Sequence, residues 1–228
     1  MTHDLIVIGA GPAGISAALT AASLGLKTVL LDEQPRAGGQ IYRNVTVAPQ
    51  TVTKLLGPDY LYGRTMAEQL ERSGVDVRHT TVVWDVARDL SVTAMQAGRS
   101  FQLRAPQVIA ATGAMERPSP IPGWTLPGVM NAGAAQIALK SAGSIPSGPV
   151  VLAGGGPLLL LVACQLLEAG AILAGIVETS PAANRWSALP HLPAALRTPA
   201  ALLKGLGFLR KLRSAGMPWF TGATELAV

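Results

Sequence analysis

Two apolar runs dominate the chain, at residues 5–31 and 150–177, and they share one internal plan. Each run begins with a short continuous apolar stretch, passes through a cluster of glycines, and resumes as a segment long enough for a helix. Short apolar stretches bounded by turn residues are typical of strands buried in a parallel sheet. The pattern predicts an internal repeat of two strand–turn–helix–strand units: strands at 5–8 and 27–31 around a helix at 15–24, and strands at 150–153 and 172–177 around a helix at 157–169.

Between these runs the apolar and polar residues alternate, which is typical of half-buried strands. The alternation predicts a small antiparallel meander from residues 75–87, 91–97 and 100–105, with Trp84 in the core. A further buried strand ends in the tight turn of "QVIAATG". The remaining predictions are helices at 60–73 and 131–142, a loop at 35–39, a proline-rich connector at 118–129, and proline-punctuated helices within 187–215.

Composition and charge narrow the class of protein. A hydrophobic content of 49% with 14% charged residues suits a buried sheet and argues against disorder. The net charge of +5 is local, because residues 179–224 hold six basic residues and no acidic one, which leaves 12 basic and 13 acidic residues elsewhere. A near-neutral body gives little support to a nucleic-acid partner. The basic segment "LLKGLGFLRKLR" predicts a helix that covers the second unit or contacts another protein chain, with a membrane-surface helix as the alternative.

Cysteine and histidine usage excludes several kinds of site. Cys164 is the only cysteine, so this chain can form no internal disulfide, cysteine-rich zinc site or dithiol redox pair, and we expect a core thiol. His3, His79 and His191 show no ligand spacing, so no metal site is predicted. Glycine turns and charged residues interrupt both apolar runs, and the start lacks a signal peptide's basic region. We therefore expect a cytoplasmic protein without a membrane span.

The glycine turn of the first unit has the spacing of a dinucleotide site, Gly9-Ala10-Gly11-Pro12-Ala13-Gly14. The first glycine permits a tight turn, the second lets the backbone approach a pyrophosphate, and the third lets the helix pack closely on the strand. The helix N–H groups and dipole then face the phosphates. Asp32 follows the second strand, 23 residues after Gly9, where an acid accepts hydrogen bonds from ribose hydroxyls. Glu33 is the competing acid, and we expect only one of the two to point inward.

Three further segments resemble a known group of flavoproteins. The segment "VLLDEQPRAGGQIYR" resembles the FAD-binding domain of the glutathione-reductase-like, pyridine-nucleotide-disulfide-oxidoreductase-like superfamily, and "VIAATGAMERPSPIPGWTLPGVMNAGAAQ" resembles its second FAD motif. With "GGGPLLLLVACQLLEAGA" they narrow the resemblance to the FAD subunits of bacterial heteromeric amine oxidases and dehydrogenases. That group includes opine oxidase A subunits, proline and hydroxyproline dehydrogenase α-type subunits, hydrogen cyanide synthase B subunits and sarcosine oxidase α. The similarity runs over essentially the whole chain.

The resemblance implies an α/β fold with an FAD-binding Rossmann-like parallel sheet, a small antiparallel meander and an incomplete second Rossmann-like unit. Its domains would be residues 1–117, which bind FAD, and residues 118–228, a linker with a partial NAD(P)-type domain. The cofactor-binding residues that it implies, together with those of the glycine turn, are Gly9, Gly11, Pro12, Ala13, Gly14, Asp32, Glu33, Gly39, Gln40, Val83, Ala111, Thr112 and Gly113.

The resemblance also implies a reaction, the oxidation of a C–N bond in an amino acid, opine or secondary amine by hydride transfer to the flavin. No side chain stands out as an acid or base, which a substrate site on a partner subunit would explain. Two alternatives stay open. One is an NAD(P)H-dependent flavin reductase or electron-transfer subunit, and the other is a non-catalytic fragment that needs a partner. Disulfide reduction, known in the superfamily, is excluded by the single cysteine.

The second unit departs from the fingerprint at its third glycine. The run Gly154-Gly155-Gly156-Pro157-Leu158-Leu159 has a leucine where the helix must approach the strand, and we expect it to push the helix away. Glu178 follows the next strand one residue late relative to Asp32. Gly154, Gly156 and Glu178 are candidates for a second nucleotide site, but a packing scaffold is slightly favoured. NAD(P) binding stays open.

The chain also lacks a segment that the superfamily uses. Its members return to the FAD domain after the second domain and bring a Gly-Asp motif to the cofactor. This sequence has no Gly-Asp dipeptide. We therefore expect an N-terminal fragment, a truncated product or one piece of a split protein.

Overall fold

The computed structural model describes residues 3–181 and 183–228 and divides into two compact units, unit 1 up to Met115 and unit 2 from Glu116 to Val228. Unit 1 contains β1 (Leu5–Ile8), α1 (Pro12–Ser23), β2 (Thr28–Leu31), α2 (Gln50–Arg72), β3 (Asp76–Arg78), β4 (Thr81–Val86), β5 (Ser91–Gln96), β6 (Arg99–Arg104) and β7 (Gln107–Ala110). Unit 2 contains α3 (Ala132–Ala142), β8 (Val150–Gly154), α4 (Pro157–Glu168), β9 (Leu173–Glu178), α5 (Ala183–Ser187), the 3₁₀ helix η1 (Leu189–His191), α6 (Leu192–Ala195), α7 (Pro199–Ser214) and β10 (Trp219–Thr221).

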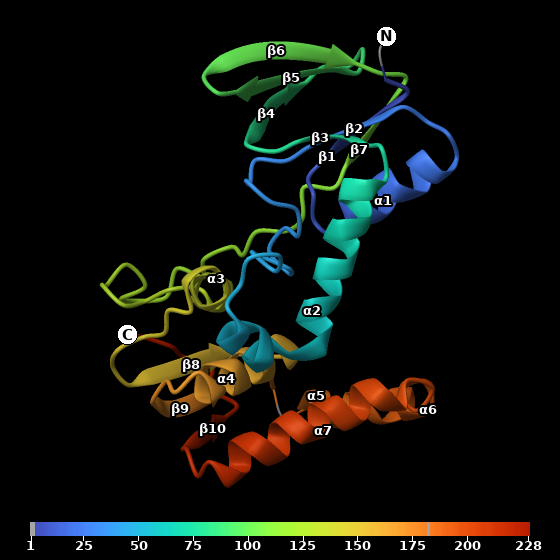
Figure 1. Cartoon of the computed structure of the whole chain (residues 1–228). Coiled ribbons are helices and arrows are strands. Elements are labelled where there is room, and N and C mark those ends of the chain that lie inside the picture. Colours follow the sequence, from blue (N-terminus) through green and yellow to red (C-terminus); the bar gives the residue numbers. More distant parts are fainter. Residues whose placement is uncertain (1–2, 182) are drawn as a thin grey trace. The chain divides into compact units, whose positions relative to one another are not determined.

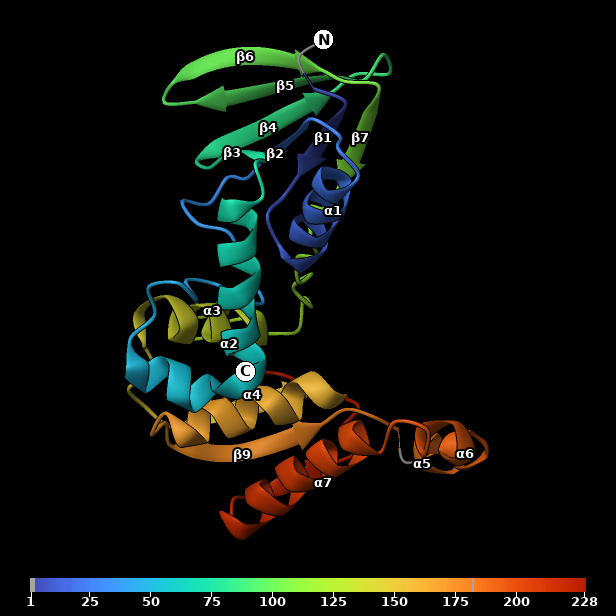
Figure 2. The same ribbon diagram turned by 45° about the vertical axis from the view of Figure 1, so that its right-hand side comes forward.

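Unit 1 is built on a parallel sheet in the order β3-β2-β1-β7 (Figure 1). Helices α1 and α2 pack on one face, where they meet Leu5 and Val7 of β1. The antiparallel sheet β4-β5-β6 packs on the other face, against Ile6 and Ile8 (Figure 2). Since both faces of β1 are covered, all four of its residues must be apolar, which explains the continuous run in the sequence. The α/β fold with a parallel sheet and a meander is confirmed.

Both helices of unit 1 begin earlier than the sequence pattern predicts. α1 begins at Pro12 and not at residue 15, because a proline costs nothing in the first turn, where its missing N–H would lack a partner anyway. α2 begins at Gln50, ten residues before the predicted start. Its backbone leaves the helical region at Gly57 (φ 78), directly before Pro58, and this break led the prediction to begin after it.

The meander differs from the prediction in two respects. Residues 76–78 form β3 and pair in parallel with β2, so they belong to the main sheet. The prediction that Trp84 is a core residue is wrong, since 62% of its surface is exposed. The β4–β5 pairing shifts register between Val83 and Asp85, and this bulge places Trp84 on the outer surface.

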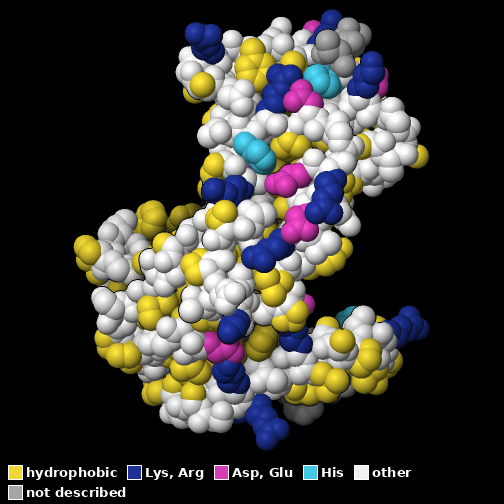
Figure 3. All heavy atoms as spheres, in the orientation of Figure 1, with side chains coloured by type: hydrophobic (Ala, Val, Ile, Leu, Met, Phe, Trp, Pro, Cys, Tyr) yellow, Lys and Arg dark blue, Asp and Glu magenta, His cyan; other side chains and the backbone are white. Residues whose placement is uncertain are grey.

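Unit 2 has a parallel sheet in the order β10-β9-β8. Helices α4 and α7 pack together over it in a core that includes Leu159, Ile176 and Leu212. The basic C-terminal segment therefore supplies a covering helix, as predicted. The outer face of α7 exposes Leu203 and Leu206, and Figure 3 shows hydrophobic side chains at the surface in the region of α5 to α7.

Cys164 lies in the unit 2 core with 2% of its surface exposed, so the prediction of a core thiol is confirmed. Burial raises the pKa of this thiol, although the Lys211 ammonium acts in the opposite direction.

Among the helices of residues 3–181 and 183–228, none combines the length and the apolar character needed to cross a membrane.

Candidate functional site

Two glycines of the first turn are required by close packing. Gly9 has φ +100°, and a Cβ there would lie 2.5 Å from the carbonyl oxygen of Ala111. A Cβ on Gly14 would lie 1.8 Å from the carbonyl oxygen of Gly9. Both distances are far below van der Waals contact, so a side chain at either position would force β1, α1 or the end of β7 to move. These glycines bring the start of α1 and the end of β7 together around the turn.

Gly11 differs from the other two glycines. It caps α1 with φ −73°, which any residue can adopt, and a Cβ there would meet only the Cα of Gly39, at 3.9 Å. Gly39 (φ +58°) comes close to Gly11, since its own Cβ would lie 2.8 Å from the Gly11 Cα. The packing of unit 1 thus does not require a glycine at position 11. Free space in front of a glycine backbone is what a pyrophosphate needs.

The first turn of α1 supplies donors for such a ligand. The first N–H groups of a helix have no partner within the helix, and at this end they carry the positive end of the helix dipole. Pro12 has no N–H, so Ala13 and Gly14 are the donors that follow Gly11. No acidic side chain lies in this first turn to compete for them. The turn therefore fits an anionic group.

The two competing acids point in different directions. Asp32 is 7% exposed, and its carboxylate accepts hydrogen bonds from the N–H groups of Ala10 (2.5 Å) and Gln34 (2.7 Å). The carboxylate of Glu33 is exposed and accepts a hydrogen bond from the side-chain amide of Gln34, at 3.0 Å. One acid of the pair points inward, as predicted, and it is Asp32. It lies directly against the glycine turn.

The "ATG" segment also reaches the turn. The N–H of Ala111 donates to the carbonyl of Ile8 at 2.8 Å, which extends the β1–β7 ladder by one residue. Gly113 has φ +78°, a backbone conformation that favours glycine, and Thr112 between them is exposed. The structure thus brings the fingerprint, Gly39 and Ala111 together.

Two of the predicted residues lie farther from the turn, and one contact at the turn was not predicted. Val83 lies on β4, half-buried against the core on the meander side, and Gln40 is exposed in the loop after Gly39. Sequence reasoning missed the N–H of Gly38, which donates to the carbonyl of Ala10 at 2.7 Å and ties the Gly-Gly loop to the turn. The paired glycines were the available signal. Within residues 3–181 and 183–228, no cluster of three or more His, Cys, Asp or Glu residues could hold a metal ion.

The second fingerprint has a different geometry. Gly156 caps α4 with φ +80°, whereas the equivalent Gly11 has φ −73°. Leu159 is 6% exposed in the core of unit 2, where its side chain takes the place of the close helix contact made by Gly14. Neither Gly154 nor Gly156 would bring a Cβ within 4 Å of another group. One reason is that, among the described residues, β8 is an edge strand and has no neighbour like β7.

The register between β8 and β9 accounts for the one extra residue before Glu178. The pairing of β8 with β9 skips one residue between Leu173 and Gly175, so a bulge absorbs the extra residue. As a result Glu178 pairs opposite Gly154. Asp32 stands in the same relation to Gly9, since Ile8 pairs with Leu31 one residue earlier. Glu178 is therefore not late in the structure.

A cavity of about 720 Å³ lies at this second turn. It is lined by Gly156, Leu159, Leu160, Glu178, Leu209, Arg213, Met217, Trp219 and Thr221. The structure therefore places two of the three candidates for a second nucleotide site, Gly156 and Glu178, on one cavity.

Comparisons with known proteins identify a matching family and several relatives. A family model described as pyridine nucleotide-disulphide oxidoreductase matches residues 3–190. The opine oxidase A subunit of Agrobacterium tumefaciens (strain Ach5) is 48% identical over 219 residues, which cover 92% of this chain and 43% of that protein. The HcnB subunit of hydrogen cyanide synthase from Pseudomonas aeruginosa is 38% identical over 95% of this chain and 47% of its own length. The chain thus spans less than half of these relatives.

A solved structure shares the fold. The crystal structure of L-proline dehydrogenase from P. horikoshii superimposes with a TM-score of 0.60 at 22% identity, over 79% of this chain and 36% of that chain.

Proposed function

The chain belongs to the pyridine nucleotide-disulphide oxidoreductase family, whose members are FAD-dependent oxidoreductases, and from this premise we propose that it binds FAD at the Gly9–Gly14 turn. The observation that carries the proposal is Gly11. A Cβ at this position would meet only the Cα of Gly39, and the φ of Gly11 does not require glycine. The first turn of α1 follows Gly11 directly. Asp32 points inward beside it, at the position of a ribose-binding acid.

Each group around the turn has a proposed role. The N–H groups of Ala13 and Gly14 bind the pyrophosphate, and the Asp32 carboxylate binds the adenosine ribose. Gly39 and the 111–113 segment keep bulky side chains away from the cofactor's path. Val83 and Gln40 are proposed as outer contacts. FAD, when bound, supplies the two-electron oxidation, and the protein positions it.

We propose an amine-type substrate, whose C–N bond is oxidised. The support comes from the two relatives, named as subunits of an opine oxidase and of a hydrogen cyanide synthase. Those names also support a companion chain in a heteromeric assembly. We propose further that residues 1–117 form the FAD-binding domain, that residues 118–228 form a partial NAD(P)-type domain, and that the protein works in the cytoplasm.

The absorption spectrum of the purified chain tests FAD binding. After incubation with FAD and removal of free cofactor, the flavin bands should stay with the protein in a ratio near one to one. A chain that keeps no flavin, alone and with its companion chain, would overturn the proposal. Bleaching of those bands by an amine under anaerobic conditions, with the companion chain present, tests the substrate class separately.

A second candidate is an NAD(P)H-dependent flavin reductase. The observation that favours it is the cavity of unit 2, which Gly156 and Glu178 line. Leu159 argues against it, because its side chain fills the place where a nucleotide-binding helix approaches its strand. Anaerobic addition of NADH separates the two, since only the reductase would have its flavin bleached.

A further inference from the structure

The two units repeat one sheet plan, but the described part of unit 2 holds less of it. Unit 1 has the strand order β3-β2-β1-β7 and unit 2 has the order β10-β9-β8, so β8, β9 and β10 correspond to β1, β2 and β3. After β3, unit 1 continues with the antiparallel sheet β4-β5-β6 and then with β7. After β10, the described residues 222–228 form no helix or strand. Among the described residues, unit 2 therefore has no counterpart of the antiparallel sheet or of β7.

In unit 1 the antiparallel sheet buries one face of the parallel sheet. Ile6 and Ile8 of β1 and Val29 and Leu31 of β2 lie on this face, and each is at most 8% exposed. Burial of such apolar side chains is a main source of folding free energy. The stability of unit 1 thus depends on a second sheet that packs against the first.

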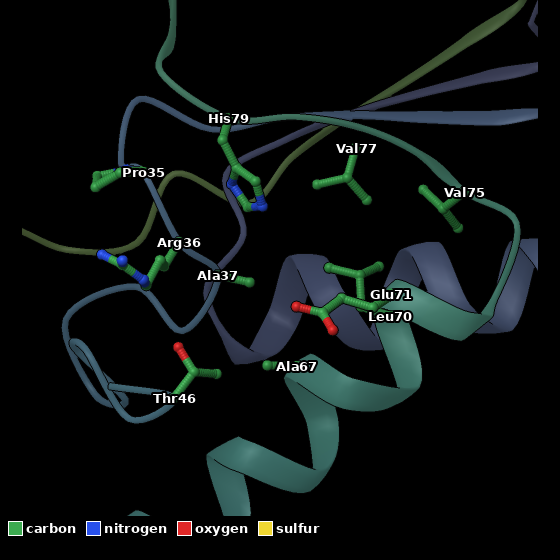
Figure 4. Close-up of a pocket in the computed structure, with 10 residues that line it drawn as sticks. All are labelled: Pro35, Arg36, Ala37, Thr46, Ala67, Leu70, Glu71, Val75, Val77 and His79. Carbon is green, nitrogen blue, oxygen red and sulfur yellow. The ribbon is translucent and has the colours of Figure 1, made fainter. Parts of the chain in front are cut away.

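Strand β3 shows which residue of β10 belongs to the same face in unit 2. Val77 of β3 points toward α2, on the helix side of the sheet (Figure 4). The next residue, Arg78, lies on the other face, and its guanidinium carbon lies 5.5 Å from the centre of the Phe101 ring in β6. In β10, Trp219 packs into the core on the helix side of unit 2. Phe220 therefore lies on the face that corresponds to that of Arg78.

The equivalent face of unit 2 is not covered. When the first fingerprint glycines of the two units are aligned, Val151 and Ala153 take the positions of the two β1 residues that the antiparallel sheet buries. Val151 is 60% exposed, and Ala153 is exposed as well. Val177 pairs with Ala153, and Phe220, which is 59% exposed, pairs with Val177. We call these four residues the open face. None of them is charged, and a contiguous exposed apolar surface is typical of an interaction site.

We propose that the open face binds an antiparallel β-sheet with an apolar face, supplied by polypeptide outside this sequence, and that a strand of the same polypeptide pairs with the free edge of β8. The internal repeat supports this occupant, because unit 1 covers the same face with such a sheet and pairs β7 with β1. An edge strand offers unpaired N–H and C=O groups to an added strand. The inference does not rest on FAD binding at the glycine turn.

The length of a relative supports the same occupant. This chain matches 43% of the opine oxidase A subunit of Agrobacterium tumefaciens, so more than half of that protein lies outside the match. A second copy of this chain is a poorer candidate, because its antiparallel sheet is already packed against its own unit 1.

The shape of the open face restricts the side chains of the bound sheet. Ala153 and Gly175 stand where unit 1 has Ile8 and Val29. Packed sheets lie about 10 Å apart, so smaller side chains on one sheet require larger ones on the other. We therefore expect bulkier residues opposite these two positions than the valine and alanine that β5 buries in unit 1.

Co-expression tests the proposal. The full chain, with an affinity tag, is produced together with the part of the Agrobacterium opine oxidase A subunit that it does not match. The two polypeptides should purify as a one-to-one complex. Hydrogen exchange of the amides of residues 150–154 should slow at least about tenfold in the complex, because strand addition pairs the free edge of β8. Flavin absorbance reports FAD binding separately, so failure of one proposal is distinguishable from failure of the other.

Three variants identify the surface. Phe220→Lys should raise the dissociation constant of the complex at least about tenfold in analytical ultracentrifugation, because it places an unpaired charge in the interface. Val151→Lys, on a different strand, should have the same effect. Leu203→Lys is the matched control, since Leu203 is 68% exposed on α7, on the helix side of unit 2, and the variant should bind normally. Circular dichroism checks that each variant is folded.

Three results would refute the proposal. The first is the absence of a complex on co-expression. The second is an unchanged affinity in folded Phe220→Lys and Val151→Lys, or an equal loss in Leu203→Lys. The third is a dimer of this chain alone that Phe220→Lys dissociates, because the occupant of the open face would then be a second copy.

Discussion

Replacement of Gly11 by valine separates the cofactor role of the glycine turn from its structural role. The backbone of Gly11 has φ −73° and needs no glycine, and a Cβ would meet only the Gly39 Cα, at 3.9 Å. Because the residue caps α1, a valine should cost no more than about 1 kcal/mol of folding free energy. The fold of unit 1 should survive.

The effect on FAD should be much larger. A branched side chain at this position occupies the space through which the pyrophosphate reaches the first turn of α1. Losing two hydrogen bonds to a charged phosphate removes about 1.5–3 kcal/mol each. The variant should therefore bind FAD more than about 100-fold more weakly. Flavin absorbance after removal of free cofactor measures this, and far-ultraviolet circular dichroism measures the fold.

Gly14→Ala is the matched comparison, since its Cβ would lie 1.8 Å from the Gly9 carbonyl oxygen. Overpacking of this kind costs about 1–3 kcal/mol or more, so this variant should lower the unfolding temperature. The reasoning fails if Gly11→Val keeps one flavin per chain. It also fails if Gly11→Val unfolds while Gly14→Ala does not.

The remaining predictions concern the acids, the second turn and the thiol. Asp32→Ala should weaken FAD binding by about 1–3 kcal/mol in a fluorescence titration, and Glu33→Ala by much less, because only Asp32 points inward; the reverse order would contradict this geometry. NADH should not bleach bound flavin anaerobically, and Leu159→Gly should lower stability by about 2–5 kcal/mol in a denaturant titration, since Leu159 is a core side chain; stoichiometric bleaching would instead support the reductase. Cys164 should not react with a disulfide reagent at pH 8 until guanidinium unfolds the chain, because burial raises its pKa and keeps it a thiol; fast reaction of the folded chain would show that unit 2 opens there.

The sequence predicted the glycine turn and its neighbourhood well, for a local reason. Strand β1 matches the predicted residues 5–8, and strands β2, β8 and β9 lie within one residue at each end of their predicted positions. A strand covered on both faces must be apolar at every position, and the positive φ of a turn residue such as Gly9 favours glycine. Such constraints act on a residue and its near neighbours, so they can be predicted from the local amino-acid sequence.

Only the tertiary structure decided the features that depend on distant segments. Trp84 is exposed because a bulge in β4 shifts its pairing with β5, and Glu178 pairs opposite Gly154 because a bulge absorbs one residue of β9. Asp32 is the inward acid because the N–H of Ala10, 22 residues earlier, binds its carboxylate. The amino-acid sequence by itself determined that the chain would build a tight glycine turn between β1 and α1. Strand pairing and the packing of unit 1 decided which side chains face this turn. These features depend on contacts between residues that lie far apart in the sequence.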